Sequence, residues 1–387
     1  MVQALKTNGA SMYITKENGF VIPPRDPYAI AAAMQDIFLE KPGKQLPHPL
    51  KIRKACLLTM NTADLQNSKT TLVNQKSKCP LCNSHGIFSF ESKDFLYKKS
   101  ETYRYIQCTN CSAIYQDPMP TTAEISSFYP DDYSAYHEVS IPKRQGFTRL
   151  ATLRYKYHYT HLNVPPPFML LVPFISSFLY RNAIHFVPDG RGLDIGCGNG
   201  QFIINMNSLG WQFEGVEFNP LGVKVCRKAG LKVFHGELHA AKFEDNTFDL
   251  VSARHLIEHI PDPNRFINEI ARILKKKGRL IIDTPNSEAL GRNWFGTYWF
   301  ANEVPRHLIL FNPKNLTLLI ERHGLRLVAC RTHTSPTIIL NSWDLLTKNR
   351  GKPSRKHSIL RFLARLYGLL TTVTRKGDKI FAIYEKL

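Results

Sequence analysis

Residues 191–200 read Arg-Gly-Leu-Asp-Ile-Gly-Cys-Gly-Asn-Gly, and this stretch decides the fold of the chain. Residues 193–195 predict the end of a buried strand, and a helical pattern starts at Gln201. Between them glycine occupies every second position, at Gly196, Gly198 and Gly200. Glycine tolerates a sharp turn and lets the backbone approach a ligand closely. The stretch therefore predicts a ligand-binding turn that joins a strand to a helix.

Strands and helices alternate after this turn. Further strands are predicted at residues 213–217, 231–234, 247–251 and 279–283. Helices are predicted at residues 219–229 and 265–274, and the second helix is expected to end in the basic turn 275–278. This alternation predicts an α/β fold with a doubly wound parallel sheet and helices on both faces.

Two acidic residues accompany the turn. Asp194 stands just before the first glycine, and Glu217 ends the next predicted strand. A nucleotide-binding α/β unit places a carboxylate at such a position, where it accepts hydrogen bonds from the ribose hydroxyls. The glycine spacing differs from the dinucleotide fingerprint Gly-x-Gly-x-x-Gly, so a cofactor other than a dinucleotide is expected.

Four segments resemble, in their order, the class I S-adenosylmethionine (SAM)-dependent methyltransferases of the ubiquinone-biosynthesis-like group. They are Leu-Asp-Ile-Gly-Cys-Gly-Asn-Gly, Phe-Asp-Leu-Val, Ile-Glu-His-Ile-Pro-Asp-Pro and Ile-Asp-Thr-Pro-Asn, from residues 193, 248, 257 and 282. The resemblance implies a Rossmann-like sheet of seven strands and SAM as the methyl donor. It also implies a set of cofactor-binding residues: Asp194, Gly196, Gly198 and Gly200 at the methionine part, Glu217 at the ribose, and Glu237 and Leu238 near the adenine. Taken alone, the glycine-rich turn could be purely structural.

Four of the eight cysteines form two pairs, Cys79-x2-Cys82 and Cys108-x2-Cys111. Two such knuckles can supply four thiolates to one structural Zn²⁺, and an alternating pattern at 87–107 favours a small β-hairpin between them. The spacing is typical of a zinc ribbon. The alternative is a pair of disulfides in a secreted domain, which we disfavour because the chain opens with no secretory signal.

The ribbon, the connector that follows it and the methyltransferase segment together resemble a bacterial family of zinc-ribbon methyltransferases. The genes of that family commonly accompany those for surface polysaccharides and other glycoconjugates. The resemblance implies O-methylation of a sugar hydroxyl in a glycan or in a nucleotide- or lipid-linked precursor, as part of polysaccharide biosynthesis. We therefore expect a cytoplasmic enzyme, with peripheral contact to the inner face of a membrane left open.

Several aromatic and basic residues follow the fifth predicted strand, where an open α/β sheet places its ligand. Trp294, Trp299 and Arg306 are candidate acceptor-binding residues. Arg306 would bind an acidic sugar or a phosphate, or would pair with a structural carboxylate.

A hydroxyl acceptor benefits from a general base, most often histidine. The candidates are His307, His255 and His259. His307 is favoured by its place in the acceptor-side loop, although it could equally fix that loop by a structural hydrogen bond. Glu258 and His259 could also belong to a divalent-metal site, as in some related quinone O-methyltransferases, or could simply pack at a helix start.

The predicted domains are a glycosyltransferase-like remnant (1–45), a linker (46–78), the zinc ribbon with its connector (79–135), a helical linker (136–183) and the methyltransferase domain (184–387) with an insertion at 336–375. The remnant is predicted because residues 17–39, with Asn-Gly, Pro-Pro and an alanine-rich stretch, resemble a late segment of the GT-B glycosyltransferases. Only this short piece of such a fold is present, and chance similarity is the alternative.

The chain is strongly basic, with 51 Lys and Arg against 31 Asp and Glu and a net charge of +20. Such a charge favours an anionic partner, whether phosphate, nucleic acid or a membrane surface. Residues 348–370 predict a basic amphipathic helix able to lie on an anionic membrane, and residues 165–186 are apolar but too short to span one. Both stretches could instead pack on the core.

Two other functions were weighed. The charge also suits an RNA methyltransferase, but residues 253–256 read Ala-Arg-His-Leu and lack the Asn-Pro-Pro-Tyr type of base-methylating tetrad. A non-catalytic zinc-ribbon interaction protein could retain the fold as a scaffold, although the intact turn and Glu217 argue for a retained SAM site.

Overall fold

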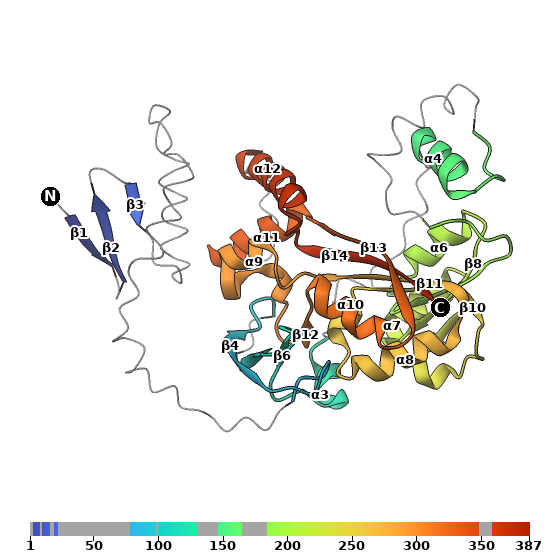
Figure 1. Cartoon of the computed structure of the whole chain (residues 1–387), viewed down its shortest axis with the longest axis horizontal. Coiled ribbons are helices and arrows are strands. Elements are labelled where there is room, and N and C mark those ends of the chain that lie inside the picture. Colours follow the sequence, from blue (N-terminus) through green and yellow to red (C-terminus); the bar gives the residue numbers. More distant parts are fainter. Residues whose placement is uncertain are drawn as a thin grey trace. The chain divides into compact units, whose positions relative to one another are not determined.

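The computed structural model describes residues 3–7, 10–15, 19–21, 78–97, 100–129, 146–164, 184–347 and 358–387. The chain divides into two units (Figure 1), one made of Met1–Lys76 with Asn293–Gly296 and one made of Ser77–Arg292 with Thr297–Leu387.

The first unit contains a small antiparallel sheet of three strands. They are β1 (Gln3–Thr7), β2 (Ala10–Thr15) and β3 (Gly19–Val21), paired in that order. The alanine-rich part of the predicted glycosyltransferase-like remnant and nearly all of the linker 46–78 lie outside the described residues.

The second unit is built on a sheet of seven strands in the order β13-β14-β11-β10-β7-β8-β9. The strands are β7 (Arg191–Ile195), β8 (Gln212–Glu217), β9 (Val233–His235), β10 (Phe248–Arg254), β11 (Leu274–Pro285), β13 (Leu325–His333) and β14 (Lys379–Lys386). All neighbours are parallel except β14, which runs antiparallel to both β11 and β13. The predicted doubly wound α/β fold and its seven strands are confirmed.

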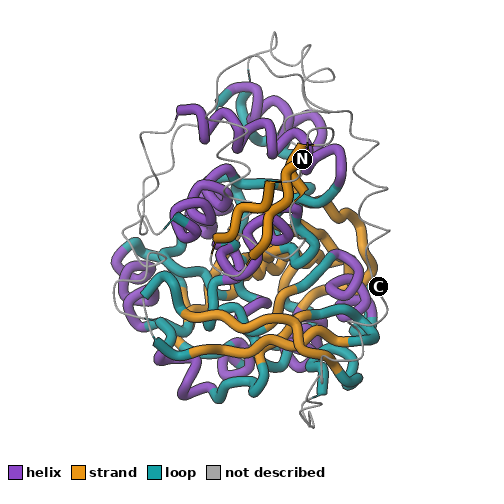
Figure 2. The backbone as a smooth tube through the Cα atoms, turned by 90° about the vertical axis from the view of Figure 1, so that its left-hand side faces the viewer, coloured by secondary structure: helices purple, strands orange, loops and turns teal. Residues whose placement is uncertain are grey.

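Helices pack on both faces of this sheet (helices purple and strands orange in Figure 2). Along β11, Leu280 and Ile282 belong to one apolar cluster and Ile281 to another, because successive side chains of a strand point to opposite faces. The first cluster takes in α8 (Pro263–Ile273) and α10 (Pro313–Glu321). The second takes in α6 (Gln201–Asn207) and α7 (Pro220–Lys228).

The expected basic end of the helix at 275–278 is wrong. The helix α8 ends at Ile273, and Leu274 already has the extended backbone of β11. Leu274 is fully buried beside Phe248 of β10, and Lys275 Nζ reaches Asp249 at 2.8 Å. Burial of Leu274 and the ion pair of Lys275 therefore stabilise these two residues as part of the sheet.

The cysteine region forms a second sheet, in the order β12-β6-β5-β4. It consists of β4 (Gly86–Lys93), β5 (Thr102–Cys108), β6 (Ile114–Gln116) and β12 (Ile309–Leu310), followed in the chain after β6 by α3 (Thr122–Ser127). The predicted hairpin at 87–107 is confirmed by the antiparallel pairing of β4 with β5. The last strand, β12, comes from far along the chain, so residues 78–129 share a sheet and an apolar core with the larger part of the unit.

The described residues from 78 onward contain four further α-helices and four short 3-10 helices. They are α4 (Phe147–Tyr157), α9 (Leu290–Phe295), α11 (Pro336–Leu346), α12 (Ser358–Thr374), η2 (Leu238–Ala241), η3 (Ile257–His259), η4 (Gly296–Tyr298) and η5 (Phe300–Asn302). The last strand, β14, pairs antiparallel with β13, and α11 and α12 lie between the two in sequence.

Two predicted segments are only partly described. Of the basic helix predicted at 348–370, residues 348–357 lie outside the described residues, and α12 continues to Thr374. Of the apolar stretch 165–186, residues 165–183 lie outside them too. Among the described helices, none combines the length and apolar character needed to span a membrane.

One buried ion pair joins the cysteine region to the segment between η5 and β12. Arg306 and Asp94 both have fully buried side chains, and Arg306 Nη1 and Nη2 donate to the Asp94 carboxylate at 2.9 and 3.2 Å. Arg306 Nε also donates to Glu303 at 3.1 Å. Arg306 thus pairs with structural carboxylates, the second of the two roles that the sequence left open for it.

Replacing Arg306 with methionine would leave Asp94 buried without its cation. We expect the free energy of unfolding of R306M to fall by about 3–5 kcal/mol, measured by urea denaturation.

Arg326→Met is the matched control, because Arg326 also pairs with a carboxylate (Glu385, 3.0 Å) but its side chain is 62% exposed. Its loss should cost at most about 1 kcal/mol. Equal losses in the two variants would contradict a structural role for the buried pair.

Candidate active site

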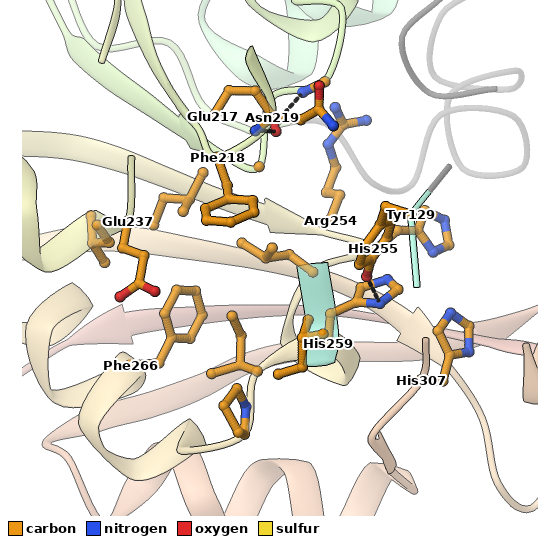
Figure 3. A pocket seen from close by; sticks show the side chains of 18 of the residues that line it. Tyr129, Glu217, Phe218, Asn219, Glu237, Arg254, His255, His259, Phe266 and His307 are labelled. Atoms are coloured by element: carbon orange, nitrogen blue, oxygen red, sulfur yellow. Dashed lines mark hydrogen bonds between the residues drawn. The ribbon is translucent and has the colours of Figure 1, made fainter. Parts of the chain in front are cut away.

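A cavity of about 640 Å³ opens at the carboxyl ends of β7, β8 and β10. Both the glycine-rich turn and the three candidate histidines line it. Figure 3 shows Glu217 and Asn219 on one side of this cavity and His259 and His307 on another. In a sheet of this topology, the gap between β7 and β10 is where the strand order reverses, and ligands bind there.

The glycine-rich turn has the backbone that its residues predict. Gly196, Gly198 and Gly200 have φ angles of +65°, +56° and +81°. A Cβ on Gly196 would lie 2.9 Å from the Leu256 side chain, and one on Gly200 would lie 2.3 Å from Leu231. Gly196 and Gly198 line the cavity, whereas Gly200 caps α6 and does not.

Glu217 ends β8 at the cavity wall and holds the turn in place. Its two carboxylate oxygens accept hydrogen bonds from the backbone N–H of Gly198 (2.7 Å) and of Asn219 (2.8 Å). Burial raises the pKa of Glu217, while these backbone hydrogen bonds oppose the rise. Each oxygen keeps a further lone pair, so the carboxylate can still accept a hydrogen bond from a ligand hydroxyl.

The other predicted cofactor residues divide into two groups. Glu237 and Leu238 line the cavity at the start of η2. Asp194 does not line it; its carboxylate is buried, and Arg254 Nη2 lies 3.7 Å away. Burial raises the pKa of Asp194, and Arg254 opposes that rise. Asp194 therefore lies behind the wall, where it can position Arg254.

His307 lies in the opposite wall and is nearly fully buried. Its Nδ1 lies 2.9 Å from the Ala301 carbonyl, which can only accept, so Nδ1 carries the proton and Nε2 keeps its lone pair. Nε2 lies 3.5 Å from Glu303 and 3.9 Å from Glu258. Burial lowers the pKa of His307 to about 4, so the imidazole is neutral at pH 7.

His259 is oriented by two neighbours. Its Nδ1 lies 2.9 Å from the Arg306 carbonyl and 2.8 Å from the Tyr129 hydroxyl. Because the carbonyl can only accept, Nδ1–H is the donor, and Nε2 is the free base nitrogen. Figure 3 shows the contact between Tyr129 and His259.

His255 lies apart from this pair. It also lines the cavity, and its Nε2 bonds with Lys379 Nζ at 2.9 Å. Its Nδ1 lies 3.5 Å from Glu258. The sequence-predicted histidines are thus all brought to one cavity, with Glu258 close to two of them.

Glu258 is fully buried, and one of its oxygens lacks a hydrogen bond. Thr284 donates to Oε2 at 2.8 Å, whereas Oε1 has no hydrogen-bond partner among the described residues. Burial acts to raise the pKa of Glu258, but the surrounding histidines outweigh it and lower this pKa to about 2. One ligand atom from each of Glu258, His259 and His307 lies within 4.8 Å of the others, a spacing that suits a divalent cation.

The three predicted acceptor-binding residues do not line the cavity. Arg306 is buried in its ion pairs. Trp299 is buried as well and donates from Nε1 to Asp378 at 3.3 Å. Trp294 lies on α9.

One wall comes from the cysteine region, and its residues were not among the predicted site residues. Thr122, Ile125 and Ser126 of α3 line the cavity, and so does Tyr129 just beyond that helix. The sequence signal for the helix is Thr121 with Glu124, which form a capping box. The capping residues do not indicate that α3 lies opposite the glycine-rich turn in the folded chain.

The four predicted metal ligands form a compact cluster of free thiols, not disulfides. Cys79 Sγ lies 3.6 Å from Cys111 Sγ, and Cys82 Sγ lies 3.4 Å from Cys108 Sγ. In a tetrahedral zinc site with Zn–S bonds of about 2.3 Å, the sulfurs lie about 3.8 Å apart. The hydrogen bond from Cys79 lowers the pKa of the Cys111 thiol to about 5, which favours a thiolate. The cluster therefore fits a Zn²⁺ ion.

Residues 173–329 match the family described as a methyltransferase domain. A ubiquinone biosynthesis O-methyltransferase of Xanthomonas oryzae pv. oryzae is 34% identical over 136 residues, covering 33% of this chain and 57% of that protein. The mitochondrial ubiquinone biosynthesis O-methyltransferase of Schizosaccharomyces pombe is 27% identical over 151 residues, covering 37% of this chain and 47% of that protein. The chain thus spans about half the length of these relatives. A SAM-dependent methyltransferase structure from Archaeoglobus fulgidus is 21% identical, covers 56% of this chain and 92% of its own, and gives a TM-score of 0.37.

The position of Glu217 predicts its effect on cofactor binding. In E217Q one carboxylate oxygen becomes an amide nitrogen, which cannot accept a hydrogen bond, so either the backbone N–H of Gly198 or that of Asn219 loses its acceptor. Since a hydrogen bond to a charged group contributes about 1.5–3 kcal/mol, we expect SAM affinity to fall about 10- to 100-fold in isothermal titration.

Glu244→Gln is the control, because Glu244 is exposed and lies outside the cavity wall. The affinity of E244Q for SAM should equal that of the unmodified chain. Unchanged affinity in E217Q would refute the role of Glu217 at the cofactor.

Proposed function

We propose that this chain, which contains a class I SAM-dependent methyltransferase domain, transfers the methyl group of SAM to a hydroxyl oxygen of a sugar in a glycan or glycan precursor. One observation carries the proposal of methyl transfer. A single cavity joins the glycine-rich turn and Glu217 to buried His307 and to the less buried His259 and His255. Methyl transfer by in-line displacement needs mainly such a shared space, in which the acceptor oxygen is held against the methyl carbon.

The cofactor half of the cavity suits SAM residue by residue. Glu217 would accept from the ribose hydroxyls, and Gly196 and Gly198 leave room for the methionine part against the backbone. Glu237 and Leu238 would flank the adenine. Arg254, set by Asp194, lines the same wall and can donate to the methionine carboxylate.

The acceptor half supplies a base. His307 is neutral, and its Nδ1–H is fixed on a carbonyl, so Nε2 can take the proton of the acceptor hydroxyl. The oxygen then bonds to the methyl carbon, and the electron pair of the broken C–S bond returns to sulfur, which leaves as the thioether. Glu303 and Glu258 lie close enough to stabilise the imidazolium that forms.

Glu258, His259 and His307 also fit a divalent cation, which when bound would make an acceptor hydroxyl more acidic. The unpartnered Oε1 of Glu258 supports this alternative, because a cation would satisfy that buried oxygen. Methyl transfer assisted by a bound cation would need a divalent metal, whereas methyl transfer with His307 as the base would not.

We further propose that the four cysteines hold a structural Zn²⁺. The ion would hold the knuckle at Cys79–Cys82 against α8, where Asn264 donates to the Pro80 carbonyl at 2.7 Å. It would also keep the segment that leads to α3 in place. Zinc would therefore help to build the acceptor wall.

Two observations support a sugar acceptor. The ribbon and its connector resemble those of methyltransferases whose genes accompany glycan synthesis. The cavity is also lined by Arg265 and Lys379, whose cations suit a phosphate or an acidic sugar in place of Arg306. The names of the relatives favour a second acceptor class, a phenolic hydroxyl of the ubiquinone-precursor type.

The acceptor class is tested by methyl transfer from radiolabelled SAM to separate pools of nucleotide sugars, a dihydroxybenzoate and short RNA. Label in the sugar pool supports the proposal. Label only in the benzoate or only in RNA overturns the sugar assignment and leaves the methyltransferase standing. SAM binding without transfer to any pool would favour the non-catalytic alternative.

Removing the proposed base should stop turnover without removing the cofactor. For His307→Asn we expect kcat to fall about 10²- to 10⁴-fold while the dissociation constant of SAM stays within about twofold. Exposed His235 provides the control variant His235→Asn. If the unmodified chain loses activity to a chelator and regains it with Mg²⁺ at constant zinc content, the cation route replaces the base route.

Removing the proposed zinc should disturb the acceptor side of the cavity more than the cofactor side. We expect the unmodified chain to bind about one equivalent of zinc, as a four-thiolate site does, and the double variant Cys79→Ser/Cys111→Ser to lose it. Elemental analysis measures the zinc content of both proteins. Methyl transfer should fall further than SAM affinity. Cys330→Ser, outside the cluster, is the control and should keep both. Equal zinc content in the two proteins would refute the site.

A further inference from the structure

The helix α12 carries an exposed apolar stripe. Its members follow one another at helical spacing along one side: Phe362, Leu366, Leu369, Leu370 and Val373. The most exposed of them are Val373 (83%) and Leu369 (67%). Five large apolar side chains on one face of one helix form a continuous patch, unlike the single exposed apolar residues that are normal on a protein surface.

The opposite face anchors the helix, so the exposure of the stripe is not a sign of a loose element. Ala364, Tyr367 and Thr371 are buried. The Tyr367 hydroxyl donates to Asp378 at 2.9 Å, and Thr371 shares a hydrogen bond with Thr334 at 2.8 Å. The fold therefore holds the stripe outward.

The sequence of α12 and its flanks is basic. Between residues 348 and 376 it has no acidic residue and nine basic ones. Arg375 and Lys376 are exposed directly after the helix. An apolar stripe beside these two cations, in a chain of net charge +20, is complementary to the surface of an anionic bilayer, which takes apolar side chains below its headgroups and attracts cations to them.

We propose that α12 docks this chain on an anionic lipid bilayer. The helix would lie in the interface plane, with the stripe toward the acyl chains. A second copy of the chain is disfavoured as the occupant, because pairing two stripes would bring together two proteins that each have a net charge of +20. The proposal goes beyond methyl transfer and does not depend on the acceptor.

The position of α12 gives docking a consequence for the site. In the chain α12 follows α11, and the two helices pack on each other. Ile338 of α11 lines the cavity. Docking would therefore bring that side of the cavity toward the membrane, where a lipid-linked acceptor would be presented.

The test is flotation of the full-length chain with vesicles of phosphatidylcholine alone or mixed with phosphatidylglycerol. We expect at least about tenfold stronger binding to the mixed vesicles, lost at high salt. The variant Leu369→Glu/Val373→Glu should lose at least about tenfold in this binding. SAM titration and circular dichroism establish that the variant is folded.

The control, Leu318→Glu/Val328→Glu, adds the same charge at exposed apolar positions outside the stripe, which are 41% and 46% exposed. It should bind the mixed vesicles nearly as well as the unmodified chain. An equal loss in both variants, or equal binding to both vesicle types, would overturn the proposal. So would a vesicle-independent dimer that only the stripe variant dissociates.

Discussion

The buried charge of Arg306 is the constraint on which the rest of the second unit depends. A guanidinium group that is buried away from water needs an anionic partner. Arg306 forms ion pairs with Asp94 of the cysteine region and with Glu303 next to the site. The same residue accepts from His259 through its carbonyl and donates to the Phe128 carbonyl at 3.3 Å. Seating this one side chain therefore fixes the cysteine region, the end of α3 and two histidines relative to one another.

The cavity follows from this arrangement. One wall is the glycine-rich turn and Glu217, at the carboxyl ends of β7 and β8. The other wall is assembled from α3, Tyr129 and the loop with His307, held by Arg306 and by the pairing of β12 with β6. A metal held by the four cysteines would act on the chemistry only through this wall.

The electrostatics of the acceptor side reflect a competition between burial and pairing. Burial keeps His307 neutral, while Glu258 stays ionised because histidines surround it. One ligand atom from each of Glu258, His259 and His307 lies within 4.8 Å of the others. Such a cluster can accept a proton from a hydroxyl or hold a cation, and either role would activate the acceptor.

The sequence by itself determined the sheet and the cofactor side, because these depend on local chemistry. Glycine at alternate positions allows the turn, and Glu217 follows at the end of the next strand. The hairpin and the thiol cluster were also predictable from spacing. Only the tertiary structure decided the acceptor side. Arg306 and Trp299 look like ligand contacts in sequence but are buried by partners as distant as Asp94 and Asp378. Tyr129 and α3 reach the cavity only because the cysteine region packs across the sheet, and such long-range packing leaves no periodic signal along the chain.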